Sequence, residues 1–184
     1  MNPRAVCVAL LVLFGAMEFF MRRGTTAKSL QAHATDRGTT PLILLSYAFC
    51  VVALSIPAPR LMWPEWVRWL GVLSCAAGTI LRLWSMHTLG QYYTRTLVTT
   101  PNQSVVCRGP YRVVRHPGYL SAMLVWVSAA VGSGAVMATI AVLVLLAVGY
   151  VIRIRAEERM LVEELGLEYR EYQKRSWRLI PLLY

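Results

Sequence analysis

Five long apolar runs dominate this sequence and restrict it to a helical fold embedded in a membrane. A bilayer-spanning helix needs about 20 predominantly apolar residues, and five segments approach that length. They cover approximately residues 4–21, 41–56, 64–89, 118–131 and 135–152. Hydrophobic residues make up 57% of the chain, above the roughly 45–50% of soluble domains. We therefore expect an all-α integral membrane protein with about five transmembrane helices.

The connections between these runs refine the expected topology. The first run could be the core of a signal peptide, but no small-x-small cleavage site follows it before Arg22, so we expect a retained helix. Gly132-Ser133-Gly134 leaves room only for a tight hairpin between the fourth and fifth helices. After residue 152 the sequence turns charged and amphipathic with no helix breaker before Gly166. We expect the fifth helix to continue into the cytoplasm as a C-terminal helical extension.

Basic residues are distributed unevenly between the connecting segments. The formal net charge is +10, and the basic residues gather in three segments, 22–40, 90–117 and the tail from 153. The segments expected on the other side of the membrane hold only Arg4, Arg60 and Arg68. The positive-inside rule places the N-terminus outside and the three basic segments in the cytoplasm, with membrane lipid as a partner. No aromatic-basic RNA motif or recognition-helix pattern accompanies the charge, so we do not expect nucleic acid as a partner.

The cysteines do not indicate a metal site or a disulfide framework. Three of the four lie inside apolar runs and no CxxC motif occurs. We interpret Cys7, Cys50, Cys75 and Cys107 as packing residues and expect no metal.

The segment RGPYRVVRHPGYL, residues 108–120, interrupts the apolar pattern with basic residues, glycines and prolines. Pro110 and Pro117 forbid regular helix, so this segment is a loop with free backbone polar groups. Such backbone persists at membrane depth only where it is buried in protein or lines a cavity. Tyr111 and Tyr119 offer aromatic faces to a cation or an adenine. Taken alone, His116 is more typical of a structural hydrogen-bonding residue than of a catalytic one.

A second polar group is expected where the fifth helix leaves the bilayer. Arg153 and Glu157 are four residues apart and share a helix face, with Glu158 beside them. An interfacial salt bridge explains this spacing, with the arginine snorkelling to the surface. Ionisable groups near bilayer depth also mark functional sites, and both interpretations stay open on spacing alone.

Together these motifs resemble the isoprenylcysteine carboxyl methyltransferase family, which belongs with the membrane-embedded phospholipid methyltransferases. The family pattern is G-x-Y-x-x-x-R-H-P-x-Y, then R-x-x-x-E-E, then G-x-E-Y-x-x-Y. This chain carries it as Gly109, Tyr111, Arg115, His116, Pro117 and Tyr119; Arg153, Glu157 and Glu158; and Gly166, Glu168, Tyr169 and Tyr172. The resemblance covers roughly residues 90–184. It implies one methyltransferase domain over 1–184, with three helices in 1–89 and the catalytic core in 90–184.

The resemblance also implies S-adenosyl-L-methionine as cofactor, bound without a Rossmann sheet. The sequence agrees, because it contains no strand-GxGxxG-helix unit. By position, the cofactor-binding residues are Gln103, Ser104, Val105, Val106, Tyr111, His116, Pro117, Gly118, Tyr119 and Glu157. Glu157 is expected to bind the cationic amino group. The candidate catalytic residues are Arg153, which holds the methyl acceptor, and Glu158. Arg108 and Arg112 are interpreted as headgroup anchors.

The resemblance leaves the methyl acceptor open. Carboxyl methylation of an isoprenylcysteine-like lipid is the leading hypothesis, since a carboxylate is already anionic and needs only an orienting arginine. A phenolic lipid would need a base, for which His116 and Glu158 are the nearby candidates. N-methylation of a phospholipid headgroup is a further alternative.

A non-catalytic transporter or assembly subunit is the alternative from another class. Its expected signature is a polar pathway through the spans, and the polar residues there are too few to form one. They include Glu18, Ser46, Ser74, Thr79, Ser128 and Thr139. Glu18 lies one turn before Arg22, and we interpret the two as an interfacial ion pair.

Overall fold

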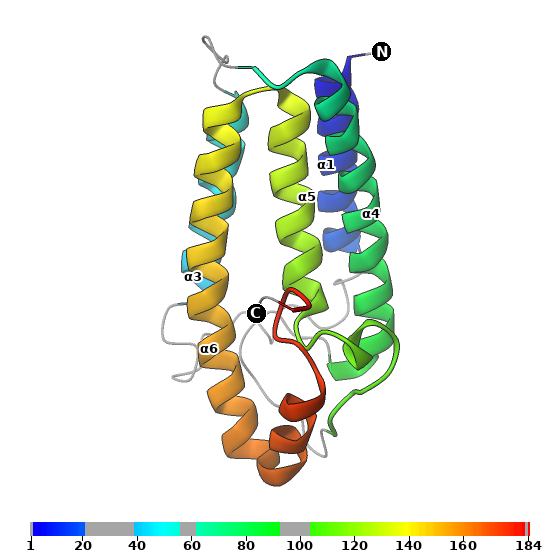
Figure 1. Ribbon diagram of the computed structural model, residues 1–184, viewed down its shortest axis with the longest axis vertical. Helices are drawn as coiled ribbons and strands as arrows, with labels where there is room; N and C mark the ends of the chain where they lie inside the picture. The colour runs from blue at the N-terminus through cyan, green and yellow to red at the C-terminus, as the bar shows by residue number, and fades with distance from the viewer. Residues whose placement is uncertain (1, 21–38, 56–61, 93–103, 183) are drawn as a thin grey trace.

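The computed structural model describes residues 2–20, 39–55, 62–92, 104–182 and 184. Over these ranges it contains five α-helices and no sheet (Figure 1). The helices are α1 Pro3–Phe20, α3 Thr39–Ser55, α4 Glu65–Leu89, α5 Pro117–Ser133 and α6 Val136–Arg175, and two 3-10 turns are η2 Gly90–Tyr92 and η3 Gly109–Arg112. The predicted all-α architecture is therefore confirmed. The helix expected at 118–131 is slightly longer in the structure, where α5 begins at Pro117 and ends at Ser133.

The outward-facing side chains indicate the medium that surrounds the bundle. Among the described residues, α1, α4 and α6 are long and apolar enough to cross a bilayer, while Pro41–Ser55 and Pro117–Ser133 are shorter apolar helices. Many large apolar side chains lie on the outside of the bundle. Examples are Val12, Leu45, Leu73, Ile80 and Val148, each more than half exposed. Such a surface is stable only against lipid, so the chain is an integral membrane protein.

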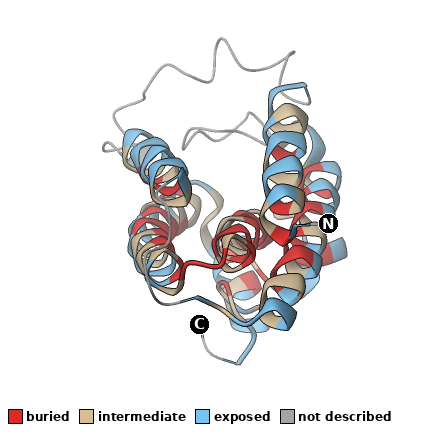
Figure 2. Ribbon diagram, turned by 90° about the horizontal axis from the view of Figure 1, so that it is seen from above, coloured by how far each residue is buried: buried red, intermediate tan, exposed pale blue. Residues whose placement is uncertain are grey.

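Seen from above, α5 lies in the middle of the bundle, between the α1–α4 pair and α6 (Figure 2). Two glycines of α4 allow it to approach α5 closely. A Cβ atom at Gly71 would lie 2.9 Å from the backbone of Gly132, and one at Gly78 would lie 2.9 Å from Val125. Gly71 and Gly78 are two turns apart, so they form a flat stripe against α5. This close approach fixes the position of α5 relative to α4, and with it the position of the loop that precedes α5.

The α5–α6 hairpin is as tight as the sequence predicts. Gly134 has a φ of 98°, in the left-handed region that favours glycine, and its N–H donates to Val131 O. The chain before α4 pairs with this turn, since Trp63 N donates to Gly134 O at 2.8 Å. The indole of Trp63 also donates to Thr139 Oγ1 at 3.1 Å. This end of the bundle is therefore closed by a compact hydrogen-bonded turn.

The other end is dominated by α6, which extends well beyond its neighbours (Figure 1). Its part before Gly166, residues 136–165, corresponds to about 45 Å at 1.5 Å per residue, roughly one and a half times the hydrocarbon thickness. Gly166 interrupts it with a φ of 55°, as predicted, and redirects the last turns. After Arg175 the chain returns to the bundle, where Leu179 joins the apolar core. The continuous helix and the break near Gly166 are both confirmed.

A buried ion pair in the bundle gives Glu18 a partner that the sequence did not predict. Glu18 Oε1 of α1 lies 2.6 Å from Arg82 Nε of α4, so Arg82 is a partner of Glu18. Arg22, the partner expected from the sequence, lies outside the described residues. Arg82 also donates from Nη1 to Gly118 O at 2.6 Å. This arginine thereby ties α1 and α4 to the first turn of α5.

We predict that Gly71→Leu destabilises the protein, because its side chain would meet the backbone of α5. The expected cost is about 1–3 kcal/mol, the range for overpacking, measured by thermal unfolding in detergent. Gly15→Leu in α1 is the matched control, since nothing lies within 4 Å of a Cβ atom there. Equal stability of the two variants would show that the close α4–α5 contact is not required.

Candidate active site

Residues 108–119, here called the HP loop, form a folded segment that continues into the first turn of α5. Gly109 has a φ of +56°, and a Cβ atom there would lie 2.9 Å from Thr88 Oγ1. This position therefore requires glycine on two grounds, backbone conformation and space. The next residues form η3, which buries Pro110 and Tyr111. The loop thus rests on the end of α4.

The returning C-terminal segment completes the support of the HP loop. Trp177 N donates to Val113 O at 2.9 Å, and Arg115 N donates to Trp177 O at 2.8 Å, which makes a short parallel bridge. From the last turns of α6, the hydroxyl of Tyr172 donates to Tyr111 O at 2.5 Å. Burial raises the pKa of Tyr172 above its usual range, so this hydroxyl stays a donor. The part of the loop that precedes α5 is therefore held from two sides outside any α-helix.

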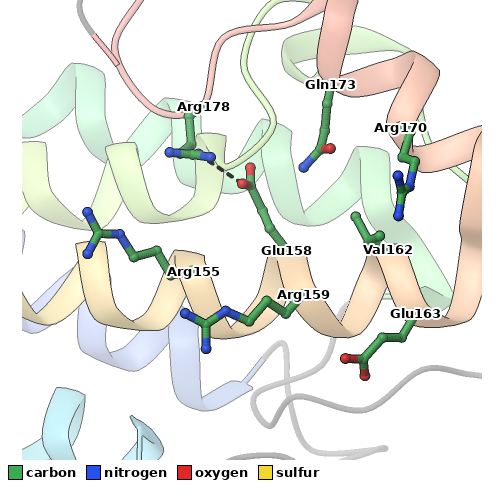
Figure 3. Close-up of a pocket in the computed structure, with 8 residues that line it drawn as sticks. All are labelled: Arg155, Glu158, Arg159, Val162, Glu163, Arg170, Gln173 and Arg178. Carbon is green, nitrogen blue, oxygen red and sulfur yellow. Dashed lines mark hydrogen bonds and ion pairs between the residues drawn. The ribbon is translucent and has the colours of Figure 1, made fainter.

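Glu158 is the central anion of this assembly and is 5% exposed. Its Oε1 accepts from Arg115 Nε at 2.8 Å and lies 3.3 Å from His116 Nε2. Its Oε2 accepts from Arg178 Nε at 2.8 Å, the contact drawn in Figure 3. Burial by itself would raise the pKa of Glu158, but the hydrogen bonds and charges of His116 and Arg115 outweigh it and lower the pKa to about 2. Glu158 is therefore an ionised anchor that binds the HP loop to α6.

Arg115 makes a second set of contacts that explains its place in the motif. Its Nη1 donates to the carbonyls of Gln173 (3.0 Å) and Ser176. One guanidinium thus joins the HP loop, α6 and the segment after it. A planar, permanently charged fork suits such a multiple contact better than lysine would.

Arg153, Tyr119 and Glu157 form a hydrogen-bonded chain where α6 leaves the apolar part of the bundle. The hydroxyl of Tyr119 donates to Glu157 Oε2 at 2.5 Å and accepts from Arg153 Nε at 3.2 Å. Arg153 is 4% exposed, whereas the Glu157 side chain keeps 24% of its surface. Of the two interpretations of this spacing, a simple salt bridge is incomplete, because Tyr119 connects the two charges. The arrangement places a buried cation and an accessible anion on either side of one phenol.

Aromatic rings extend this chain in both directions. The ring of His116 stacks on Tyr119 with centroids 5.7 Å apart, and Tyr119 stacks on Tyr150 at 5.1 Å. The hydroxyls of Tyr150 and Tyr47 lie 2.6 Å apart and share a hydrogen bond. His116 Nδ1 also lies 3.8 Å from Glu157 Oε1, so the imidazole lies between two carboxylates. The ring is therefore a fixed wall of the site rather than a freely placed base.

The remaining predicted residues fall around this centre. Val105 N donates to Glu168 Oε1 at 3.1 Å, which brings segment 104–106 to the turns after Gly166. Pro117 and Gly118 begin α5, with Gly118 O held by Arg82. Ser104 is exposed and Val106 is half-buried beside Val105. Gln103 lies outside the described residues.

Three residues of the site were missed in the sequence. Arg82 was identifiable as an unexplained charge in an apolar helix. Tyr150 and Arg178 carry no local signal, because their roles arise from contacts with Tyr119 and Glu158 that only the fold creates. Over the described part of the chain, no group of three His, Cys, Asp or Glu side chains could hold a metal ion.

We predict that acid weakens the fold through Glu158. Its folded-state pKa of about 2 lies below the usual 4.5, so its stabilising contribution is complete above about pH 4.5 and is lost as pH falls through about 2. The midpoint of thermal unfolding should fall over this window. Glu158→Gln should have a lower midpoint at pH 7 and a flatter acid profile, while Glu171→Gln, at an exposed pair with Lys174, should follow the wild type. An unchanged profile in Glu158→Gln would contradict this assignment.

Comparisons with known proteins agree on one family. The model of the isoprenylcysteine carboxyl methyltransferase (ICMT) family matches residues 69–163. Two probable protein-S-isoprenylcysteine O-methyltransferases of Oryza sativa, from subspecies indica and japonica, are each 27% identical over 95% of this chain and 94% of their own length. The uncharacterized protein YpbQ of Bacillus subtilis is 26% identical over 64% of this chain and 71% of its own.

A solved structure shares the fold. The structure of a eukaryotic intramembrane Ras methyltransferase, isoprenylcysteine carboxyl methyltransferase, matches 100% of this chain and 68% of its own length, with a TM-score of 0.69 at 18% identity. The family model covers more than half of the chain, and it includes the HP loop, Arg153, Glu157 and Glu158. The chain therefore belongs to the isoprenylcysteine carboxyl methyltransferase family and is a methyltransferase.

Proposed function

We propose that this protein transfers a methyl group from S-adenosyl-L-methionine to the carboxylate of an isoprenylcysteine-like lipid. The observation that carries the proposal is the Arg153–Tyr119–Glu157 chain, in which one hydroxyl joins a buried cation to an accessible carboxylate. An anionic acceptor and a cationic donor need such a pair of opposite charges side by side. The named activity of the Oryza sativa relatives supports the same chemistry.

The residues around Glu157 fit S-adenosyl-L-methionine by their chemistry. The cofactor carries a sulfonium, an ammonium and a carboxylate, and so needs an anion, aromatic faces and N–H donors. Glu157 supplies the anion, and the His116–Tyr119 stack supplies the aromatic faces. Segment 104–106 supplies backbone groups, with Glu168 holding Val105 in place. Tyr111, Pro117 and Gly118, together with Gln103, complete the proposed cofactor site.

Arg153 is proposed to hold the methyl acceptor. Its guanidinium is buried near the boundary of the membrane, and a planar guanidinium can bind a carboxylate in two-pronged geometry. The hydrogen bond to Tyr119 fixes its orientation. Arg153 thus positions a carboxylate of a lipid that enters from the bilayer.

The properties of Glu158 favour a carboxylate acceptor over a phenol. A phenol has a pKa near 10 and would need a base. Glu158 has a pKa of about 2 and is bound by Arg115 and Arg178, so it cannot accept a proton efficiently at neutral pH. His116 faces two carboxylates. We therefore assign Glu158 a positioning role in place of the catalytic role expected from the sequence.

The mechanism follows from these positions. When bound, S-adenosyl-L-methionine supplies a sulfonium-activated methyl group, whose transfer to a carboxylate forms a methyl ester and requires no proton transfer. Glu157 fixes the donor, Arg153 fixes the acceptor, and Tyr119 sets their separation. Alignment of the reactants and exclusion of water by the HP loop supply the catalysis, up to about 7–11 kcal/mol.

The basic residues support a cytoplasmic site and an outside N-terminus. Arg108, Arg112, Arg155 and Arg159 are exposed at the end of the bundle that carries the site, and the positive-inside rule assigns that end to the cytoplasm. We propose that residues 1–184 act as one domain, because the contacts of Arg82 join α1 and α4 to the HP loop.

Loss of the proposed cofactor anion should weaken cofactor binding. We predict that Glu157→Ala and His116→Ala bind S-adenosyl-L-methionine and S-adenosyl-L-homocysteine at least tenfold more weakly, since a hydrogen bond to a charged group is worth about 1.5–3 kcal/mol. Isothermal titration calorimetry of the purified chain in detergent measures this. Glu164→Ala, at an exposed position of the same helix, is the matched control. Absence of binding by the folded wild type would overturn the proposal.

Arg153 should affect the acceptor and not the cofactor. We predict that Arg153→Ala loses about 100-fold or more in kcat/KM for an isoprenylcysteine acceptor, while its affinity for S-adenosyl-L-homocysteine changes less than threefold, about 0.6 kcal/mol. Rate assays and calorimetry on the same preparation separate the two effects. An equal loss of cofactor affinity would move Arg153 into the cofactor site.

A further inference from the structure

A pocket lies on the cytoplasmic extension, between α6 and the segment that follows it (Figure 3). Its volume is about 440 Å³, within the range of small-molecule sites. Four arginines line it, Arg155, Arg159, Arg170 and Arg178, together with the carboxylates of Glu158 and Glu163. The proposed roles of the cofactor and acceptor do not use this arginine pocket.

The charges of the arginine pocket are not balanced internally. Glu158 is already bound by Arg115 and Arg178, and so it has little capacity for another cation. Within the described ranges, no carboxylate is recorded as a hydrogen-bond or ion-pair partner of Arg155, Arg159 or Arg170. Several guanidinium groups around one cavity form a site for an anion with several oxygen atoms.

The depth of the pocket identifies the kind of anion. Ile152, 45% exposed, is the last large apolar side chain on the outer face of α6 before the charged extension. At 1.5 Å per residue, Arg155 lies about 4–5 Å and Arg159 about 10 Å beyond it, whereas the headgroup layer is roughly 5–7 Å thick on each side. The facing wall gives the same level, because Leu179, the neighbour of Arg178, packs into the apolar core. On this scale the backbone of Arg155 lies within the headgroup layer and that of Arg159 just beyond it, from where its long side chain can reach back to lipid phosphates.

We propose that the arginine pocket binds the phosphate of an anionic phospholipid headgroup. The excess of arginines over carboxylates favours a lipid with net negative charge over a zwitterionic one. Glu158 is at once a wall of the pocket and the anchor of the HP loop. A bound headgroup therefore stabilises the same assembly that supports the methyltransferase site, and it does so whatever the methyl acceptor is.

The test compares the full chain in phosphatidylcholine nanodiscs with and without phosphatidylglycerol. Retained phosphatidylglycerol is counted by native mass spectrometry, and thermal unfolding is followed in parallel, since a ligand of the folded state raises the midpoint. We expect Arg155→Gln combined with Arg159→Gln to weaken phosphatidylglycerol binding at least tenfold and to abolish its effect on the midpoint. Lys174→Gln combined with Arg175→Gln is the control, with the same change of charge at exposed positions outside the pocket.

The outcomes distinguish a lipid ligand from a soluble anion and from general surface charge. Equal loss of phosphatidylglycerol binding in both double variants would overturn the proposal in favour of general surface charge. Glycerol phosphate and inorganic phosphate are titrated in phosphatidylcholine discs as soluble sources of the same group. If either raises the midpoint as much as phosphatidylglycerol does, the lipid assignment is wrong. Cofactor binding by the Arg155/Arg159 variant is measured alongside, and it should be unchanged, so this test and that of the methyltransferase proposal can fail separately.

Discussion

The active end of this protein depends on one buried carboxylate. Glu158 accepts hydrogen bonds from Arg115 of the HP loop and from Arg178 of the returning C-terminal segment, while its backbone belongs to α6. Three segments far apart in sequence are joined at this point. Removing one partner of a buried ion pair is strongly destabilising, because the other charge stays buried and uncompensated. The HP loop, which contains no long helix of its own, owes its position to this anion.

A hydrophobic solvent explains why the overall architecture could be predicted from sequence and the contacts of the site could not. In lipid, backbone groups must be satisfied within each segment, so every long apolar run becomes a helix. The hairpin at Gly134 and the break at Gly166 follow from the conformational freedom of glycine. The partners of Glu18, Glu158 and Tyr119 depend on side chains that the fold brings together over long sequence separations. The helix spacing of Arg153 and Glu157 predicted that the two would be near each other, but not that Tyr119 would connect them.

The different surroundings of the neighbouring carboxylates Glu157 and Glu158 also give the site its chemical character. Glu158 is held ionised by two arginines and a histidine, and it therefore organises structure rather than moving protons. Glu157 keeps an accessible surface and accepts a short hydrogen bond from Tyr119. Adjacent glutamates on α6 thus serve different purposes because successive residues face different sides of a helix. A site with no poised base suits transfer of a methyl group to an acceptor that is already anionic.

The bond formed by the transferred methyl group tests this account most directly. The purified protein is incubated with methyl-labelled S-adenosyl-L-methionine and farnesylcysteine, and the labelled product is treated with mild alkali. A carboxyl methyl ester releases its label as methanol, whereas a phenol ether or an N-methyl group is stable under these conditions. We predict alkali-labile label that depends on Arg153. Label that enters lipid only in an alkali-stable form would contradict carboxyl methylation.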